Sequence, residues 1–142
     1  MAPMTFTNPD SESIRRLLGE VKTIAVLGFS PDPARPSHTI ARGLQRSGFR
    51  VIAVRPGLED GLGEKAYPDL AAIPERVDLV DVFRASEHVP QIVDECIRLG
   101  VKNLWLQDGV VHAEAAERAR AAGITVVMDR CILRDYSRLC RS

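Results

Sequence analysis

The chain has 142 residues, of which 45% are hydrophobic and 27% charged, as expected for one globular domain. Its 19 basic and 19 acidic residues balance to a net charge of zero, so no overall field draws it to nucleic acid or anionic lipid, and we predict no nucleic-acid partner. Its apolar runs are far shorter than the roughly 20 residues of a membrane helix, and its first ten residues lack a signal-peptide pattern. We therefore expect a cytoplasmic protein with no membrane partner.

The N-terminal residues are predicted to lie outside the main domain. Residues 1–20 are expected to form an extension with a short packing helix, which Asp10 or Ser11 can cap. Residues 21–142 are expected to form the single domain.

The domain opens with a strand, a helix and a second strand. Thr23–Gly28 is an apolar run without alternation, which is typical of a strand buried on both faces of a parallel sheet. Ser37 is predicted to be the N-cap of a helix that ends at Gly48, and Phe49–Val54 is the next expected strand.

The middle of the chain combines a long loop with a third strand and helix. Residues 55–74 are rich in glycine and proline, which predicts a loop with a short helix near residues 69–72. Val77–Phe83 is expected to be a strand, followed by a helix with Pro90 in its first turn that ends at Gly100.

The remaining elements complete an alternating pattern. Asn103–Leu106 and Ile124–Met128 are predicted strands on either side of an alanine-rich helix from about Ala113 to Ala122. Such alternation predicts right-handed crossovers and an α/β fold: a Rossmann-like, doubly wound parallel sheet of about five strands with flanking helices. Ligands bind such sheets at the carboxyl ends of the strands. These ends are predicted at Gly28, Val54, Phe83 and Leu106.

The first strand end carries residues suited to a phosphate. Gly28 is followed by Ser30, Arg35 and Ser37 before a helix whose free N–H groups and dipole favour an anion. A turn glycine and a helix cap that hold no ligand would produce the same pattern. The dinucleotide fingerprint G-x-G-x-x-G is not satisfied, because Ser30 replaces the second glycine.

The other strand ends add positive charge. Val54 is followed by Arg55, where an NAD site usually has an acidic residue, so an extra ribose phosphate is favoured, as in NADP or coenzyme A. Phe83 and Arg84 offer an apolar face and a guanidinium group. Gln107 and the turn after it could line the same cleft.

No catalytic set and no metal site is predicted. The three histidines have no acid or cysteine at ligand spacing. Asp78 and Asp81 lie three residues apart on one predicted strand, so their side chains should point to opposite faces, and we do not expect them to act as a paired acid and base. Trp105 is expected in the core, and Cys131 is expected to be a structural thiol.

Taken together in this order, several segments resemble the family of small coenzyme A-binding proteins, whose domain is similar to the N-terminal coenzyme A-binding domain of the succinyl-CoA synthetase alpha subunit. The resemblance covers about Val21 to Asp135. The segments that carry it are residues 25–30, 35–37, 54–56, 62–67, 80–84, 104–107 and 127–131.

The resemblance implies which residues contact the cofactor. Those implied around its phosphates are Gly28, Phe29, Ser30, Arg35 and Ser37. Those implied along its nucleotide part are Val54, Arg55, Pro56, Phe83 and Arg84. Two positions depart from the family pattern: Arg55 stands where asparagine is usual, and Asp108 adds a carboxylate near the cleft.

We therefore hypothesise a module that binds coenzyme A or an acyl-CoA without catalysing a reaction. The ligase chemistry of the synthetase is not carried over, because its phosphohistidine and ATP-grasp partner lie in parts that this chain lacks. The alternatives are an NAD(P)-binding oxidoreductase and a regulatory partner of an acyl-CoA enzyme. The sequence makes no prediction of oligomeric state.

Overall fold

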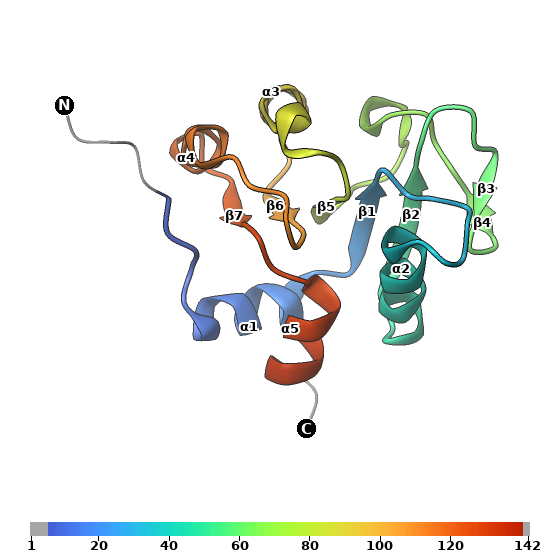
Figure 1. Cartoon of the computed structure of the whole chain (residues 1–142), viewed down its shortest axis with the longest axis horizontal. Helices are drawn as coiled ribbons and strands as arrows, with labels where there is room; N and C mark the ends of the chain where they lie inside the picture. Colours follow the sequence, from blue (N-terminus) through green and yellow to red (C-terminus); the bar gives the residue numbers. More distant parts are fainter. Residues whose placement is uncertain (1–5, 141–142) are drawn as a thin grey trace.

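In the computed structural model, which describes residues 6–140, five parallel strands form the central sheet in the order β2-β1-β5-β6-β7 (Figure 1). Their bounds are Thr23–Leu27 for β1, Arg50–Val54 for β2, Leu79–Val82 for β5, Asn103–Leu106 for β6 and Thr125–Val127 for β7. The chain passes from β1 to β2, crosses back over β1 to β5 and continues outward. This confirms the predicted Rossmann-like fold and places its switch point between β1 and β5.

Helices cover both faces of the sheet. α3 (Val89–Leu99) and α4 (Ala113–Ala121) lie on one face, and α1 (Ser11–Glu20), α2 (Pro36–Arg46) and α5 (Ile132–Leu139) lie on the other (Figure 1). Each layer has its own cluster of buried apolar side chains. The strands are buried from both sides, as their lack of polar alternation predicted.

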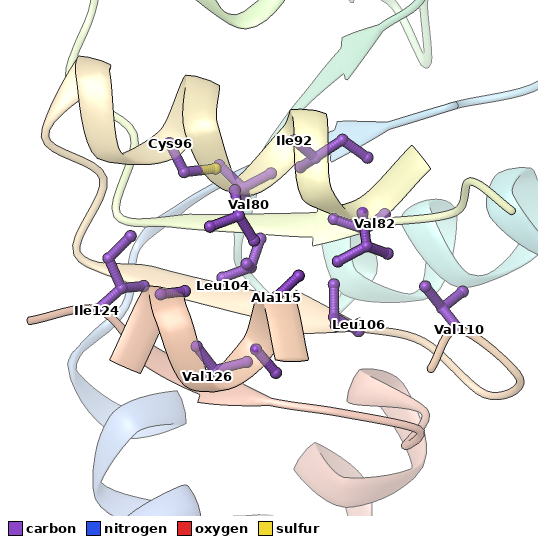
Figure 2. Packing of buried hydrophobic residues seen from close by; sticks show 14 of the residues in the cluster. Val80, Val82, Ile92, Cys96, Leu104, Leu106, Val110, Ala115, Ile124 and Val126 are labelled. Carbon is purple, nitrogen blue, oxygen red and sulfur yellow. The ribbon is translucent and has the colours of Figure 1, made fainter. Parts of the chain in front are cut away.

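The α3–α4 layer packs alternate strand residues against small helical side chains. Figure 2 shows Val80 of β5 and Leu104 of β6 between Ile92 and Cys96 of α3 on one side and Ala115 of α4 on the other. The buried alanines of α4 let that helix approach the sheet closely. Burial raises the pKa of the Cys96 thiol to about 12, so this thiol stays protonated at neutral pH. This layer fixes the ends of β5 and β6.

The opposite layer contains the bulkiest buried side chain. Trp105 is fully buried, as predicted, and its Nε1 donates to the Arg130 carbonyl at 2.8 Å. α1 adds Ile14 and Leu18 to this layer. The predicted domain boundary at residue 20 stays a prediction. Residues 1–5 of the expected extension and residues 141–142 of the expected domain lie outside the described residues.

Four short elements lie outside the main sheet and its helices, and one longer helix was not predicted. Residues 55–74 hold the two-stranded sheet of β3 (Asp60–Gly61) and β4 (Glu64–Lys65) and the short helix η1 (Leu70–Ala72), the last as predicted. η2 (Ser86–His88) precedes α3.

The unpredicted helix is α5. Its apolar residues Ile132, Leu133, Tyr136 and Leu139 recur at helical spacing and pack on one core, so the sequence carried a helical signal there that the prediction did not use. The helix also buries Asp135, whose carboxylate is bound by Arg130, five residues earlier in the chain, and this ion pair offsets the cost of burial.

The predicted strand at Val77–Phe83 is shorter than expected. β5 begins at Leu79. The carboxylate of Asp78 just before it lies at the start of β1, where Oδ2 accepts from the backbone N–H groups of Lys22 (3.0 Å) and Thr23 (2.9 Å). Asp78 therefore anchors the start of β1 and lies three residues before the buried Asp81.

Across residues 6–140, the helices are too short and too polar for any of them to span a lipid bilayer.

Candidate functional site

The carboxyl ends of β1, β2, β5 and β6 meet at one edge of the sheet. β1 lies between β2 and β5, and Leu27 is in register with Val54 on one side and Val82 on the other. The loops that leave these strands therefore start side by side, although they are up to about 80 residues apart in the chain. This convergence follows from parallel strands and was the basis of the sequence prediction.

Gly28 is required by the packing of these strand ends. Its φ is +89°, and a Cβ built there would lie 2.5 Å from the Phe83 carbonyl oxygen and 3.0 Å from Cδ of Arg84. Its N–H donates to the Val54 carbonyl at 3.0 Å. Gly28 was predicted among the residues suited to a phosphate, but the space that its missing side chain would fill is taken by the end of β5.

The loop from β1 to α2 is held by two serines. The hydroxyl of Ser37 accepts from the backbone N–H of Ser30 at 2.9 Å, and the hydroxyl of Ser30 accepts from the N–H of Asp32 at 3.1 Å. α2 begins at Pro36, and Arg35 occupies the N-cap position without a side-chain cap bond. The prediction of Ser37 as the N-cap is therefore wrong: proline favours the first helical position, and the serine one place later faces back to the loop.

The N-terminus of α2 is consequently not capped by a hydrogen bond from the side chain of its N-cap residue. Helix N-termini carry free N–H groups and a partial positive charge, and both favour an anion. Here that terminus opens on the cleft at the end of β1, since Arg35, Pro36 and Ser37 all line it.

Phe29 does not line the cleft. Its side chain is fully buried, and its ring lies 5.2 Å from that of His38, whose Nδ1 contacts the Ser30 carbonyl at 3.0 Å. Only the backbone of Phe29 faces the site, where its carbonyl accepts a long contact of 3.5 Å from Nη1 of Arg55. Any contact between Phe29 and the ligand must therefore come from its backbone. The ring is buried and packs against the loop from the protein interior.

Two cavities lie along this edge of the sheet. The first, of about 550 Å³, lies between the ends of β1 and β2, η1 and α3, and the second, of about 780 Å³, lies between the loop to α2 and the ends of β5 and β6. Gly28, Arg55 and Arg84 line both cavities. Of the ten predicted binding residues, Phe29 alone lines neither cavity.

Three exposed arginines line these cavities without a carboxylate partner. Arg35, Arg55 and Arg84 form no ion pair within residues 6–140. Arg134 of α5 differs from these three arginines. Its two Nη atoms bind the carboxylate of Asp108, which lines the second cavity, at 3.0 and 3.1 Å. The extra carboxylate expected near the cleft is thus neutralised, and the free positive charge is concentrated around Gly28.

The wall of the first cavity contains residues that the sequence analysis did not identify as ligand contacts. From η1 and α3 these are Pro68, Asp69, Leu70, Gln91, Ile92 and Glu95. The composition of residues 55–74 indicated a binding loop, but nothing in the sequence placed α3 beside it. Gln91 and Glu95 are one helical turn apart, so they present two polar groups on one face of α3.

Gln107 and Asp81 lie together at the floor of the second cavity. Gln107 lines this cavity, is 3% exposed, and donates from Nε2 to Oδ1 of the fully buried Asp81 at 2.5 Å. Burial raises the pKa of Asp81 to about 8, against the lowering effect of the bond from Gln107. The sequence excluded Asp81 from a catalytic pair but did not predict this contact.

The described residues 6–140 contain no group of three or more His, Cys, Asp or Glu side chains arranged to hold a metal ion. Cys131 lies among the buried residues just before α5, and Cys140 at the end of α5 is half-buried. Both thiols are free, and neither lines the two cavities.

Comparison with known proteins gives one family and several relatives. A family model described as a CoA binding domain matches residues 22–137. The uncharacterized protein YneT of Bacillus subtilis (strain 168) is 38% identical over 125 residues, which is 88% of this chain and 93% of that protein. A solved structure of a hypothetical protein from Pyrococcus horikoshii OT3 matches with a TM-score of 0.89 and 32% identity, covering 98% of both chains.

A longer relative contains a similar region. The ADP-forming acetate–CoA ligase I of Archaeoglobus fulgidus is 31% identical over 121 residues. The match covers 78% of this chain but only 18% of the ligase. The similarity is therefore to one part of the ligase.

Proposed function

The chain belongs to the CoA binding domain family, and we propose that it binds coenzyme A, free or as an acyl thioester, across the carboxyl ends of β1, β2, β5 and β6. The observation that carries this proposal is the group of three arginines, Arg35, Arg55 and Arg84, which surround Gly28 and the N-terminus of α2 and form no ion pair with any residue from 6 to 140. Unpaired guanidinium groups and a free helix terminus are a match for phosphate.

The two cavities lie side by side and share the arginines between them, which favours a ligand with phosphates at its centre. In coenzyme A, the phosphates join an adenosine at one end to a pantetheine arm at the other. Arg55 and Arg84 lie where the two cavities meet, so the phosphates would lie there. The adenosine end, which carries the ribose phosphate, and the uncharged pantetheine arm would then each enter one cavity.

The first cavity suits the adenosine. Its apolar wall includes Val54, Pro56 and Ile92, which could enclose the faces of a base, while Asp69 and Glu95 could accept from hydroxyl or amino groups. The second cavity, which ends at Gln107 and Val110, is then left for the pantetheine arm. Arg55 lies beside the first cavity, where it would face the ribose phosphate.

We propose a binding role because the ligase relative supplies no chemistry for this chain. Its activity belongs to a protein of which the match covers 18%. An NADP-binding role has one observation in its favour, Arg55 in the place of an acidic ribose contact, but the chain has Ser30 at the position of the second fingerprint glycine.

Freshly purified protein is the sharpest test of ligand identity. Mass spectrometry of the molecules released on denaturation should detect coenzyme A or an acyl-CoA. Calorimetry on ligand-free protein should then give a lower Kd for coenzyme A than for NAD, which lacks a ribose phosphate, and than for NADP, whose pyrophosphate would meet Ser30 in place of the second fingerprint glycine. Equal affinities, or a preference for a nicotinamide nucleotide, would overturn the proposed function.

Arg35→Ala tests the helix terminus as a phosphate site. We expect it to weaken coenzyme A binding by about 1.5–3 kcal/mol, roughly a 10- to 150-fold rise in Kd, because a hydrogen bond to a charged group is lost. Arg35 is exposed and precedes α2, so the fold should be retained. Arg42→Ala is the matched control, since Arg42 is an exposed arginine of α2 that lines neither cavity. If the two variants bind equally well, Arg35 is a solvated surface residue.

A further inference from the structure

Asp81 and Gln107 form a buried polar pair that the proposed phosphate site does not use. Asp81 lies on the central strand β5, in register with Val26 of β1 and Trp105 of β6, and has no exposed surface. Gln107 follows β6 and lines the second cavity. A carboxyl group at the centre of an apolar sheet is costly unless it is neutral or paired.

The contact between the two side chains leaves two oxygens without partners. Nε2 of Gln107 donates to Oδ1 of Asp81 at 2.5 Å, but Oδ2 of Asp81 and Oε1 of Gln107 are both buried and accept no hydrogen bond within residues 6–140. Unpaired buried acceptors are rare and unfavourable. Here both belong to groups that are already joined, so one added proton would give each of them a partner.

We propose that Asp81 carries that proton and donates it from Oδ2 to Oε1 of Gln107, so that this closed pair positions the remaining N–H of Gln107 to donate to a carbonyl oxygen of the ligand's pantetheine arm. Gln107 is then a residue that contacts the ligand, and Asp81 is its positioning residue. The ligand part of this inference rests on the proposed function, whereas the protonation of Asp81 does not.

The surroundings of Asp81 favour the neutral acid. Its pKa is raised to about 8 by burial, so the folded protein keeps the proton at neutral pH and releases it only as the pH rises through about 8. Asp81 forms no ion pair within residues 6–140, so no cation stabilises a carboxylate there.

Other titratable groups lie on the same face of the sheet. The buried and half-buried ones of α2 and of the α5 segment are His38, Arg130, Cys131, Asp135, Tyr136 and Cys140, and the titratable groups of α1 are exposed. Arg130 and Asp135 bind each other. All of these groups are unchanged by substitution at Asp81, so a difference in pH profile between the wild type and Asp81→Asn reports this site.

Asp81→Asn is the matched test of the proton. Asparagine has the shape of the neutral acid: its amide can donate to Oε1 of Gln107 while its oxygen accepts from Nε2. By calorimetry, we expect its Kd for coenzyme A at pH 7 to lie within about twofold of the wild type, and the variant should keep that affinity at pH 9, where the wild type weakens. Asp81→Ala, which removes the partner of Gln107, should bind about tenfold more weakly at both pH values. Loss of binding in Asp81→Asn equal to that in Asp81→Ala would refute the positioning role.

Gln107→Leu tests the contact with the ligand by means of two probes. We expect coenzyme A to bind roughly five- to tenfold more weakly, whereas adenosine 3′,5′-bisphosphate, which lacks the pantetheine arm, should bind within about twofold of the wild type. Retained binding of the bisphosphate also shows that the variant folds. Equal losses for both probes, or no loss for either, would contradict a contact with the arm.

Infrared spectroscopy of the wild-type protein keeps the inference testable if either variant fails to fold or if coenzyme A does not bind. The carbonyl band of a protonated carboxyl group should be present at pH 7 and should disappear as the pH is raised past about 8. Its absence at pH 7 would rule out the protonated pair. Its presence without coenzyme A binding would reject the proposed function and leave the acid–amide pair standing.

Discussion

Gly28→Ala is expected to destabilise the protein by on the order of 3–5 kcal/mol and to abolish ligand binding. Two effects add at this position. A residue with a side chain is strained at a φ of +89°, and its Cβ would lie 2.5 Å from the backbone oxygen of Phe83, which cannot rotate away. To relieve the overlap, β1 and β5 must separate at the point where both cavities meet. Urea unfolding followed by the fluorescence of Trp105, the only tryptophan, gives the free energy of unfolding.

Gly57→Ala separates the strain from the overlap. Gly57 also has a positive φ, +80°, but a Cβ built there would have no atom within 4 Å. This control should lose only about 1 kcal/mol, from backbone strain alone. If the two variants are equally destabilised, the close contact between Gly28 and the end of β5 does not govern stability.

The second large effect is expected at the ion pair that anchors α5. Arg130 donates from Nε to Oδ2 of Asp135 at 2.6 Å and from Nη2 to Oδ1 at 2.9 Å, and Asp135 is 1% exposed. Arg130→Met would leave a buried carboxylate with only Arg138, 3.5 Å away, as a partner. We expect a loss of about 2–4 kcal/mol at pH 7, below the usual cost of breaking a fully buried pair because the Arg130 side chain is 32% exposed.

The double variant Arg130→Met/Asp135→Asn shows whether the unpaired charge causes that loss. Removing the carboxylate should recover part of the stability, so the double variant should unfold at a higher urea concentration than Arg130→Met. A double variant no more stable than Arg130→Met would indicate that packing of the Arg130 side chain, rather than the unpaired charge of Asp135, accounts for the loss. Because Arg134 of α5 binds Asp108 at the second cavity, a displaced α5 should also alter ligand affinity.

The sequence by itself determined the class of fold and the edge of the sheet that carries the site. Non-alternating apolar runs mark strands buried on both faces, and helices between them require parallel strands. The carboxyl ends of parallel strands must share one edge, so Gly28, Arg55 and Arg84 could be grouped before any contact was known. That grouping depends only on local pattern and chain order.

The tertiary structure alone decided what each of these residues does there. Gly28 is confined by the end of β5, more than 50 residues away in the chain, and Ser37 binds back to Ser30 where a helix cap was predicted. The first cavity needs α3 beside η1, and Asp81 meets Gln107 only because β5 pairs with β6. Hydrophobic periodicity records which face of an element is buried. It does not record which distant segment lies against that face, because strand order and register are set by the packing of the whole chain.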